Sequence, residues 1–233
     1  MSEILKSYTQ VLNSRKHLLE MIEDRGYNVD HLKNFTEDEI KEMMLNQITG
    51  KFIALSDIGP LDIFLEKPID NKSKTETTEK IYVKYRMDSK FKGTASLTSQ
   101  ILEIYEKHLS TKDTLIVLNL GHIIMKIGVK DKVDEEYVND LFIKKNYFVQ
   151  VFGLENFKFN VSKHQFVPKH IILSKQEAQE VIKKYDCVYS NIPTIKRDDV
   201  QAKYLGLRPK QICKIIVENV SSGVTEKYRY CVH

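Results

Sequence analysis

Two histidines lie six residues apart, on either side of a Val-Pro step, in the segment KHQFVPKHIILSKQEAQEVIKKY (163–185). Imidazoles could ligate a metal ion or act as general bases there, and a nearby thiol, Cys187, could act as a nucleophile. His164 and His170 cannot share one helix face, because Pro168 between them interrupts a helix. No H-E-x-x-H or C-x-x-C occurs in the chain. We therefore expect no catalytic, cofactor-binding or metal-binding residue here, and interpret the histidines as part of a binding surface.

A second candidate for chemistry is a carboxylate, Asp62, which follows Gly-Pro-Leu in a predicted strand. Magnesium-dependent nuclease cores combine such an acid with an acid-x-Lys pair on the next strand, where the carboxylates hold the ion and the lysine orients water. The next predicted strand, KIYVKY, has Tyr82 and Lys84 at those positions. Without the second carboxylate, Mg²⁺ binding should be weak. A divergent nuclease therefore remains the weaker alternative, and it predicts Mg²⁺-dependent cleavage that Asp62→Ala abolishes.

The composition is typical of a globular protein, with 42% hydrophobic and 29% charged residues in a chain of 233. No apolar run approaches the roughly 18 residues of a membrane span, and the first ten residues do not resemble a secretory signal. Three cysteines without a C-x-x-C motif predict reduced thiols in an intracellular protein. Residues 162–233 carry 13 basic against 7 acidic side chains. A basic segment of this kind can meet nucleic acid or an acidic protein surface.

The first two thirds of the chain alternate between helical and strand-like patterns. Helices are predicted over 4–22, with Gly26 as its C-cap, over 37–46, with a Thr36–Glu39 capping box, and over 97–109 and 134–144. Strands are predicted over 51–57, 61–67, 80–87, 113–120 and 146–152, with an apolar segment at 122–129 and a polar loop over 70–80. This alternation predicts an α/β layered domain with at least one parallel crossover.

The last third has a different pattern. Ser174 and Glu177 predict a capping box before a helix whose apolar stripe is Ala178, Val181, Ile182 and Tyr185. Asp198 is expected to cap a short helix that ends near Gly206. Two strands, 211–220 and 224–232, flank a Ser-Ser-Gly turn and predict a hairpin. We therefore expect a mixed α/β (α+β) protein of two domains, 1–158 and 159–233.

Several motifs in this last third follow one another in the order and spacing of one known family. They are HQFVPKH before a capped helix, IPTIKRDD (192–199), AKYLG (202–206), ICKII (212–216), and Gly223 with Tyr228 and Arg229. Earlier, RKHLLEMIEDRGY (15–27) and DTLIVLNLGH (113–122) are similar to the same family's first helix and buried strand. The chain resembles the fifth, jaw-forming subunit of eukaryotic nuclear RNA polymerases, a family that also has a counterpart in archaeal polymerases.

This resemblance implies a non-catalytic subunit of a multisubunit DNA-directed RNA polymerase, with no cofactor and no membrane partner. Residues 159–233 would be the assembly domain that docks on the largest subunit, and 1–158 a nuclease-like jaw domain beside downstream double-stranded DNA. The partner-docking residues would be His164, Pro168, His170, Asp198, Lys203, Tyr204, Gly206, Lys214, Tyr228 and Arg229; His122 and Lys126 would lie near the DNA. A stand-alone nucleic-acid-binding protein that uses the basic segment is the other alternative.

Three positions depart from the family pattern. Lys210 replaces a turn glycine, Val217-Glu218-Asn219 replaces Arg-Pro-Ser after the ICKII strand, and residues 123–126 (IIMK) replace a Thr-Pro-Ser-Ala loop near DNA. The second change removes a basic side chain from the docking surface, and the third removes hydroxyls that could meet phosphate. Such divergence, together with frequent Lys, Ile and Asn, suggests a virus-encoded homologue. We expect a nuclear location for a cellular chain, and a cytoplasmic viral factory or the virion for a viral one.

Overall fold

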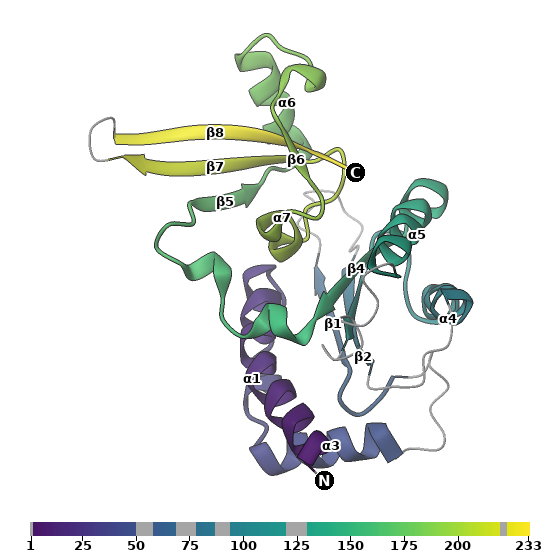
Figure 1. Cartoon of the computed structure of the whole chain (residues 1–233). Coiled ribbons are helices and arrows are strands. Elements are labelled where there is room, and N and C mark those ends of the chain that lie inside the picture. Colours follow the sequence, from purple (N-terminus) through teal and green to yellow (C-terminus); the bar gives the residue numbers. More distant parts are fainter. Residues whose placement is uncertain (1, 50–57, 69–77, 87–93, 120–129, 220–222) are drawn as a thin grey trace. The chain divides into compact units, whose positions relative to one another are not determined.

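The computed structural model describes residues 2–49, 58–68, 78–86, 94–119, 130–219 and 223–233 (Figure 1). The chain divides into two compact units, Met1–Phe159 and Asn160–His233. The mixed α/β fold class predicted from the sequence is confirmed, because each unit combines helices with a four-stranded sheet.

The sheet of the amino-terminal unit contains β1 (Ile63–Pro68), β2 (Thr78–Arg86), β3 (Thr114–Asn119) and β4 (Phe148–Gly153), in the order β1-β2-β3-β4. β1 pairs antiparallel with β2, whereas β2–β3 and β3–β4 are parallel. Each parallel pair is connected through a helix, α4 (Thr94–Lys107) or α5 (Lys130–Lys145). The predicted parallel crossover is therefore confirmed, and the described strands contain two of them.

Helices cover both faces of this sheet (Figure 1). α4 and α5 lie on one face, where Ile101, Tyr105 and Leu141 pack against Tyr82 and Leu115 in a buried cluster. β3 is buried along its whole length, as the continuous apolar run predicted. α1 (Ser2–Asp24) lies on the other side of the sheet.

Local sequence signals explain how the amino-terminal helices begin and end. Gly26 takes a φ of 88° just after α1, and the N–H groups of Gly26 and Tyr27 donate to the carbonyls of Glu23 and Ile22. This is the Schellman pattern, which requires a left-handed residue that glycine adopts without strain. After a short α2 (Asp30–Lys33), Thr36 and Glu39 form the predicted capping box at α3 (Glu37–Thr49).

The carboxyl-terminal unit contains a second sheet in the order β5-β7-β8-β6. The predicted hairpin is confirmed as the antiparallel pair β7 (Ile212–Asn219) and β8 (Gly223–Val232). β5 (Lys169–Ile172) adds to β7 antiparallel, and β6 (Thr194–Lys196) adds to β8 in parallel. Single-turn 3₁₀ segments also occur among the described residues: η1 (Leu154–Phe157) in the first unit, and η2 (Val161–Lys163) and η3 (Tyr189–Asn191) in the second.

This second sheet is packed on both faces. α6 (Lys175–Lys184) begins at the predicted Ser174–Glu177 capping box and buries Ala178 against Ile212 and Leu173. α7 (Val200–Leu205) packs Ala202 on the opposite face, against Cys213 and Cys231. Strand alternation explains the division, because Ile212 and Cys213 are neighbours whose side chains point to opposite faces.

The structure corrects three details. The residue that caps α7 is Asp199, whose carboxylate accepts from the N–H groups of Gln201 and Ala202; Asp198 is half-exposed beside Arg197. Tyr185 ends the α6 stripe but is 53% exposed, because it lies one residue beyond the helix. The predicted 70–80 loop is too long at its end, since pairing with β1 draws Thr78 into β2.

Two other predictions lie outside the described residues: the strand over 51–57 and the apolar segment over 122–129. The proposed DNA-proximal residues, His122 and Lys126, belong to that second segment. Within the described part of the chain, no helix has the length and apolarity needed to cross a membrane.

Candidate functional site

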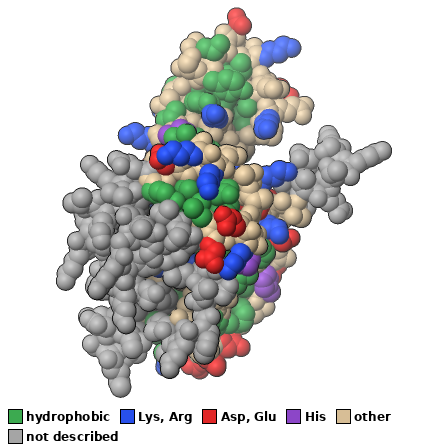
Figure 2. All heavy atoms as spheres, turned by 90° about the vertical axis from the view of Figure 1, so that its right-hand side faces the viewer, with side chains coloured by type: hydrophobic (Ala, Val, Ile, Leu, Met, Phe, Trp, Pro, Cys, Tyr) green, Lys and Arg blue, Asp and Glu red, His purple; other side chains and the backbone are tan. Residues whose placement is uncertain are grey.

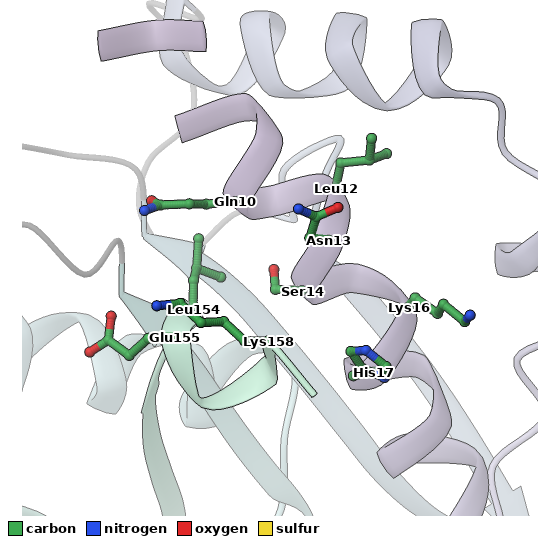
Figure 3. Close-up of a pocket in the computed structure, with 9 residues that line it drawn as sticks. All are labelled: Gln10, Leu12, Asn13, Ser14, Lys16, His17, Leu154, Glu155 and Lys158. Carbon is green, nitrogen blue, oxygen red and sulfur yellow. The ribbon is translucent and has the colours of Figure 1, made fainter. Parts of the chain in front are cut away.

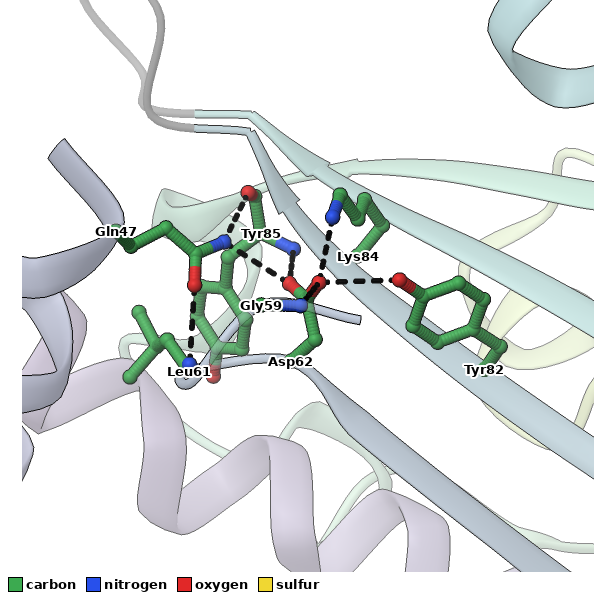
Figure 4. A network of polar contacts seen from close by, with 7 residues as sticks. All are labelled: Gln47, Gly59, Leu61, Asp62, Tyr82, Lys84 and Tyr85. Atoms are coloured by element: carbon green, nitrogen blue, oxygen red, sulfur yellow. Dashed lines mark hydrogen bonds and ion pairs between the residues drawn. The ribbon is translucent and has the colours of Figure 1, made fainter. Parts of the chain in front are cut away.

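Asp62 accepts five hydrogen bonds in the amino-terminal unit (Figure 4). Its side chain is completely buried and lies 2.6 Å from the ammonium of Lys84, which is 8% exposed. The turn before β1 brings the carboxylate onto the adjacent strand β2. The donors are Gln47 Nε2 (3.0 Å) and the Tyr85 N–H (2.9 Å) to Oδ1, and the Gly59 N–H (2.7 Å), the Tyr82 hydroxyl (3.1 Å) and Lys84 Nζ (2.6 Å) to Oδ2.

Gln47 and Gly59 close this network from the side of α3. The Gln47 amide donates to Asp62 and to the Tyr85 carbonyl, and its own oxygen accepts from the Leu61 N–H at 3.0 Å. A Cβ atom at position 59 would lie 2.5 Å from that amide oxygen, so glycine is the residue that fits. The Gly-Pro-Leu-Asp motif is therefore a turn that folds its carboxylate onto β2.

This geometry does not fit a metal-binding carboxylate. An ionised carboxylate has about four lone-pair sites, and five donors already occupy them. The ion that neutralises Asp62 is the Lys84 ammonium, and Tyr82 occupies the position where a nuclease would need its second acid. Among the described residues, no three His, Cys, Asp or Glu side chains gather as metal ligands would. Asp62 and Lys84 thus form a structural ion pair. Sequence reasoning placed Lys84 correctly in a strand, but Asp62 lies in the turn just before β1 and not in the strand predicted over 61–67.

The unit also has a pocket of about 440 Å³ between α1 and η1 (Figure 3). Most of its lining residues are polar, and their charges are mixed, with Lys16, His17 and Glu155 among them. The Ser14 hydroxyl at its wall donates to the Val11 carbonyl at 3.0 Å, so it is not held by a general base. The side chains that line the pocket do not form a catalytic group, and we assign no function to it.

His164 and His170 use their Nδ1 atoms in opposite ways. Nδ1 of His164 accepts from the Phe166 N–H at 3.3 Å, so it carries no proton. Nδ1 of His170 lies 2.7 Å from the Pro168 carbonyl, which can only accept, so this nitrogen carries the proton. Each imidazole is thus tied to its own backbone, and the structure does not join the two into one site.

Lys214, Tyr228 and Glu226 form a polar group on one face of the hairpin. Glu226 accepts from the Lys214 ammonium and, at 2.8 Å, from the Tyr228 hydroxyl. Burial, followed by the hydrogen bond to Glu226, raises the pKa of Tyr228 to about 12, while those same two donors lower the pKa of Glu226. Arg229 points to the opposite face, since it pairs with Cys213.

The remaining predicted docking residues differ in how far they reach the surface. Lys203 is half-buried on α7, whereas Tyr204 beside it is buried and its hydroxyl accepts from Asn160 Nδ2 at 3.0 Å. Gly206 ends the helix with a φ of 73°. Tyr204 and Gly206 therefore shape the unit from within, while Asp198 and Lys203 present side chains outward.

Sequence reasoning named Tyr185 and Tyr228 but missed that they belong, with Tyr189 and Tyr230, to one set of aromatic side chains on the α6 face of the sheet. Tyr185 lies 5.9 Å from Tyr228, and Tyr189 lies 5.6 Å from Tyr230, measured between ring centroids. Tyr185 and Tyr189 are exposed, as is Val188 between them. Figure 2 shows apolar side chains at the surface of this unit, with separate Lys and Arg side chains around them. The spacing of four residues between Tyr185 and Tyr189 is visible in the sequence, but only the folded structure brings the two rings against β8.

Comparison with known proteins bears on this unit directly. Residues 159–231 match the family model described as RNA polymerase Rpb5, C-terminal domain. The match spans the carboxyl-terminal unit almost from end to end, so this unit is similar to that domain. The resemblance read from the HQFVPKH, IPTIKRDD and AKYLG motifs is thereby confirmed.

Relatives extend the similarity to nearly the whole chain. The subunit RPABC1 of DNA-directed RNA polymerases I, II and III from Caenorhabditis briggsae is 26% identical over 220 residues, which are 94% of this chain and 93% of the relative. The protein of the same name from Caenorhabditis elegans has the same identity and coverage. The Dictyostelium discoideum protein is 34% identical over 89 residues, 38% of this chain and 45% of its own length. The chain is thus similar to a polymerase subunit in both of its units.

Proposed function

We propose that this chain is a non-catalytic subunit of a multisubunit DNA-directed RNA polymerase. Its carboxyl-terminal unit docks on the largest subunit, and its amino-terminal unit forms part of the jaw beside downstream DNA. The observation that carries the proposal is the match to the Rpb5 C-terminal domain at 159–231, combined with relatives that cover 94% of the chain and are named as polymerase subunits. A nuclear location follows for a cellular chain, and the three relatives described above, all eukaryotic, lend no support to the viral alternative.

The amino-terminal site supports a role other than catalysis. A nuclease needs a carboxylate that can exchange its ligands with Mg²⁺ and water. Asp62 instead neutralises a buried lysine and accepts from two backbone N–H groups, which holds the edge of the sheet together. We therefore assign the nuclease-like sheet a structural use, as the framework of the jaw.

The carboxyl-terminal unit supports a docking role through its surface. Docking surfaces of proteins favour tyrosine and arginine, which combine a large contact area with hydrogen bonding. Here exposed Tyr185 and Tyr189 flank β8, which also carries Arg229. The basic excess of 162–233 suits an acidic partner surface, and it equally favours the second candidate, a stand-alone nucleic-acid-binding protein.

Size-exclusion chromatography of the chain from its source separates these functions. A polymerase subunit should elute with the polymerase activity, far above the 27.2 kDa of the single chain. The isolated chain should bind DNA weakly, and binding should fall as salt rises. Elution of the endogenous chain at its own mass, with tight DNA binding that resides in 162–233, would favour the stand-alone alternative instead. A photoreactive downstream DNA should crosslink to this subunit within the complex if the jaw assignment is correct.

A further inference from the structure

One edge of β8 in the carboxyl-terminal unit is open over most of its length. β7 pairs with β8 from Gly223 to Tyr230 without a break in register. On its other side, β6 pairs only with Tyr230, Cys231 and Val232. From 223 to 229 no described strand covers that side, a length of about 20 Å at roughly 3.3 Å per residue.

The hydrogen bonds at the covered end show which backbone groups face the open edge. The Cys231 N–H donates to Gln211 on the β7 side, whereas the Tyr230 N–H donates to Pro193 on the β6 side, both at 2.9 Å. Backbone groups alternate in direction along a strand. The N–H and C=O groups of Val224, Glu226 and Tyr228 therefore point to the open edge.

This edge lacks three of the features that prevent another strand from adding. Natural edge strands are protected by charged side chains, by proline, by bulges or by covering segments, and β8 has only the charged side chains. The 223–232 segment contains no proline, and its unbroken register with β7 leaves no bulge between Gly223 and Tyr230. Val224 on the edge is 67% exposed, which is unfavourable for a side chain that water alone covers.

The two faces beside the edge differ in character. On the α6 face lie Val224 and Tyr228, with Tyr185 against the tyrosine ring, while the charge of Glu226 is neutralised by Lys214. The opposite face carries Lys227 and Arg229, and no acidic partner of either is found in the described residues. An added strand would thus meet apolar contacts on one face and two cations on the other.

We propose that the β8 edge binds an extended segment of another protein as a fifth strand, and that this segment alternates apolar and acidic residues. Its apolar side chains would pack on Val224 and Tyr228, and its carboxylates would pair with Lys227 and Arg229. The proposal rests on the proposed function only in that the segment belongs to a neighbouring polymerase subunit. Strand addition of this kind derives affinity from backbone hydrogen bonds and specificity from alternate side chains.

The first experiment measures amide hydrogen exchange by NMR in the full chain, with and without a synthetic peptide of alternating Val and Glu. The peptide should slow exchange at Val224, Glu226 and Tyr228, while Thr225 and Lys227, which already donate toward β7, should change little. A peptide of alternating Val and Lys should have no effect. Protection without peptide, together with a dimer in size-exclusion chromatography, would overturn the proposal in favour of pairing between two copies of this chain.

Matched variants test the same edge. Glu226→Ala removes the ion pair but keeps the edge N–H, whereas Glu226→Pro also removes that N–H, and proline is tolerated where the N–H faces solvent. We expect the proline variant to bind the Val-Glu peptide roughly tenfold more weakly than the alanine variant. The double variant Lys227→Glu/Arg229→Glu should prefer the Val-Lys peptide, whereas Lys175→Glu on exposed α6 should behave as the wild type. Equal binding by Glu226→Pro and Glu226→Ala, with both folded by circular dichroism, would overturn strand addition.

Assembly in cells separates this proposal from the function on which it rests. If the wild-type chain co-elutes with polymerase and Glu226→Pro is lost from the complex while Glu226→Ala is retained, both are supported. If all three co-elute equally, the β8 edge is not the docking site, but the polymerase role stands. If the wild-type chain elutes alone, the polymerase role fails, and the peptide experiments still decide the edge.

Discussion

Replacing Asp62 with alanine should destabilise the amino-terminal unit more than any substitution of an exposed acid. The substitution takes away the carboxylate that lies 2.6 Å from the 8% exposed Lys84 ammonium, and it leaves the Gly59 and Tyr85 N–H groups without this acceptor. Removing one partner of a buried ion pair costs about 3–5 kcal/mol, because the remaining charge stays desolvated. We therefore expect the free energy of unfolding to fall by about 4 kcal/mol, a large share of the roughly 5–15 kcal/mol of a typical domain.

Urea unfolding of the full chain, followed by far-UV circular dichroism and tyrosine emission, measures this change, since the chain has no tryptophan. Asp140→Ala is the matched control. Asp140 also lies 2.6 Å from a lysine, Lys144, but the two side chains are 55% and 70% exposed. An exposed pair of this kind contributes about 0.5 kcal/mol or less. Burial, rather than distance, should therefore separate the two variants.

The double variant Asp62→Ala/Lys84→Met decides whether the charge is responsible. Methionine removes the buried ammonium but keeps an apolar side chain of similar length, so the double variant should be more stable than Asp62→Ala by about 1–3 kcal/mol. If Asp62→Ala costs no more than Asp140→Ala, the carboxylate is not a structural counter-ion. Mg²⁺-dependent cleavage by the wild type that Asp62→Ala abolishes would refute the same reasoning from the functional side.

Three further predictions concern the carboxyl-terminal unit. Lys210 has a φ of 75°, a left-handed conformation that costs a non-glycine residue about 1–2 kcal/mol. Lys210→Gly should therefore raise the free energy of unfolding, measured in urea, by up to about 1 kcal/mol. Lys210→Ala keeps a Cβ atom and should not raise it. Burial raises the pKa of Cys213 to about 11 and that of Cys231 to about 12, so iodoacetamide at pH 8 should label Cys187, which is only half-buried, well before either; equal labelling of all three in the folded chain would contradict this. The folded-state pKa of Tyr228, about 12, lies above its ordinary value of 10.0. The contribution of Tyr228 to stability is therefore present below pH 10 and lost as pH rises toward 12. Urea unfolding should show a smaller loss of stability between pH 9 and pH 11 for Tyr228→Phe than for the wild type.

At position 210, the backbone conformation explains why the family pattern has glycine where this chain has lysine. The resemblance marked Lys210 as a replaced glycine, and the structure places it in the conformation for which glycine is suited. Its N–H donates to the Cys231 carbonyl at 2.9 Å, so the turn geometry is retained despite the strain. The second departure, at 217–219, lies at the distal end of β7, where Val217 and Glu218 continue the pairing with β8.

Much of the fold could be predicted from the sequence because its signals are local. The capping boxes at Thr36 and Ser174, the left-handed Gly26 and Gly206, and the alternation around the hairpin each involve residues within a few positions of one another. Such contacts form with little loop-closure entropy, so a short window of sequence contains the groups that decide them. The cap of α7 shows the limit of this reasoning, since two adjacent aspartates, 198 and 199, satisfy the same local pattern.

Tertiary structure decided the features that depend on partners far along the chain. β5 and β6 are four and three residues long, too short for a periodic signal, and they become strands because the β7–β8 hairpin offers them open edges. Asp62 and Lys84 stand 22 positions apart, and only the β1–β2 pairing makes them one buried ion pair. The sequence by itself determined the α/β class and the kinship of the carboxyl-terminal unit. Whether Asp62 holds a metal or a lysine, and which edge of the second sheet stays open, depended on distances that exist only in the folded chain.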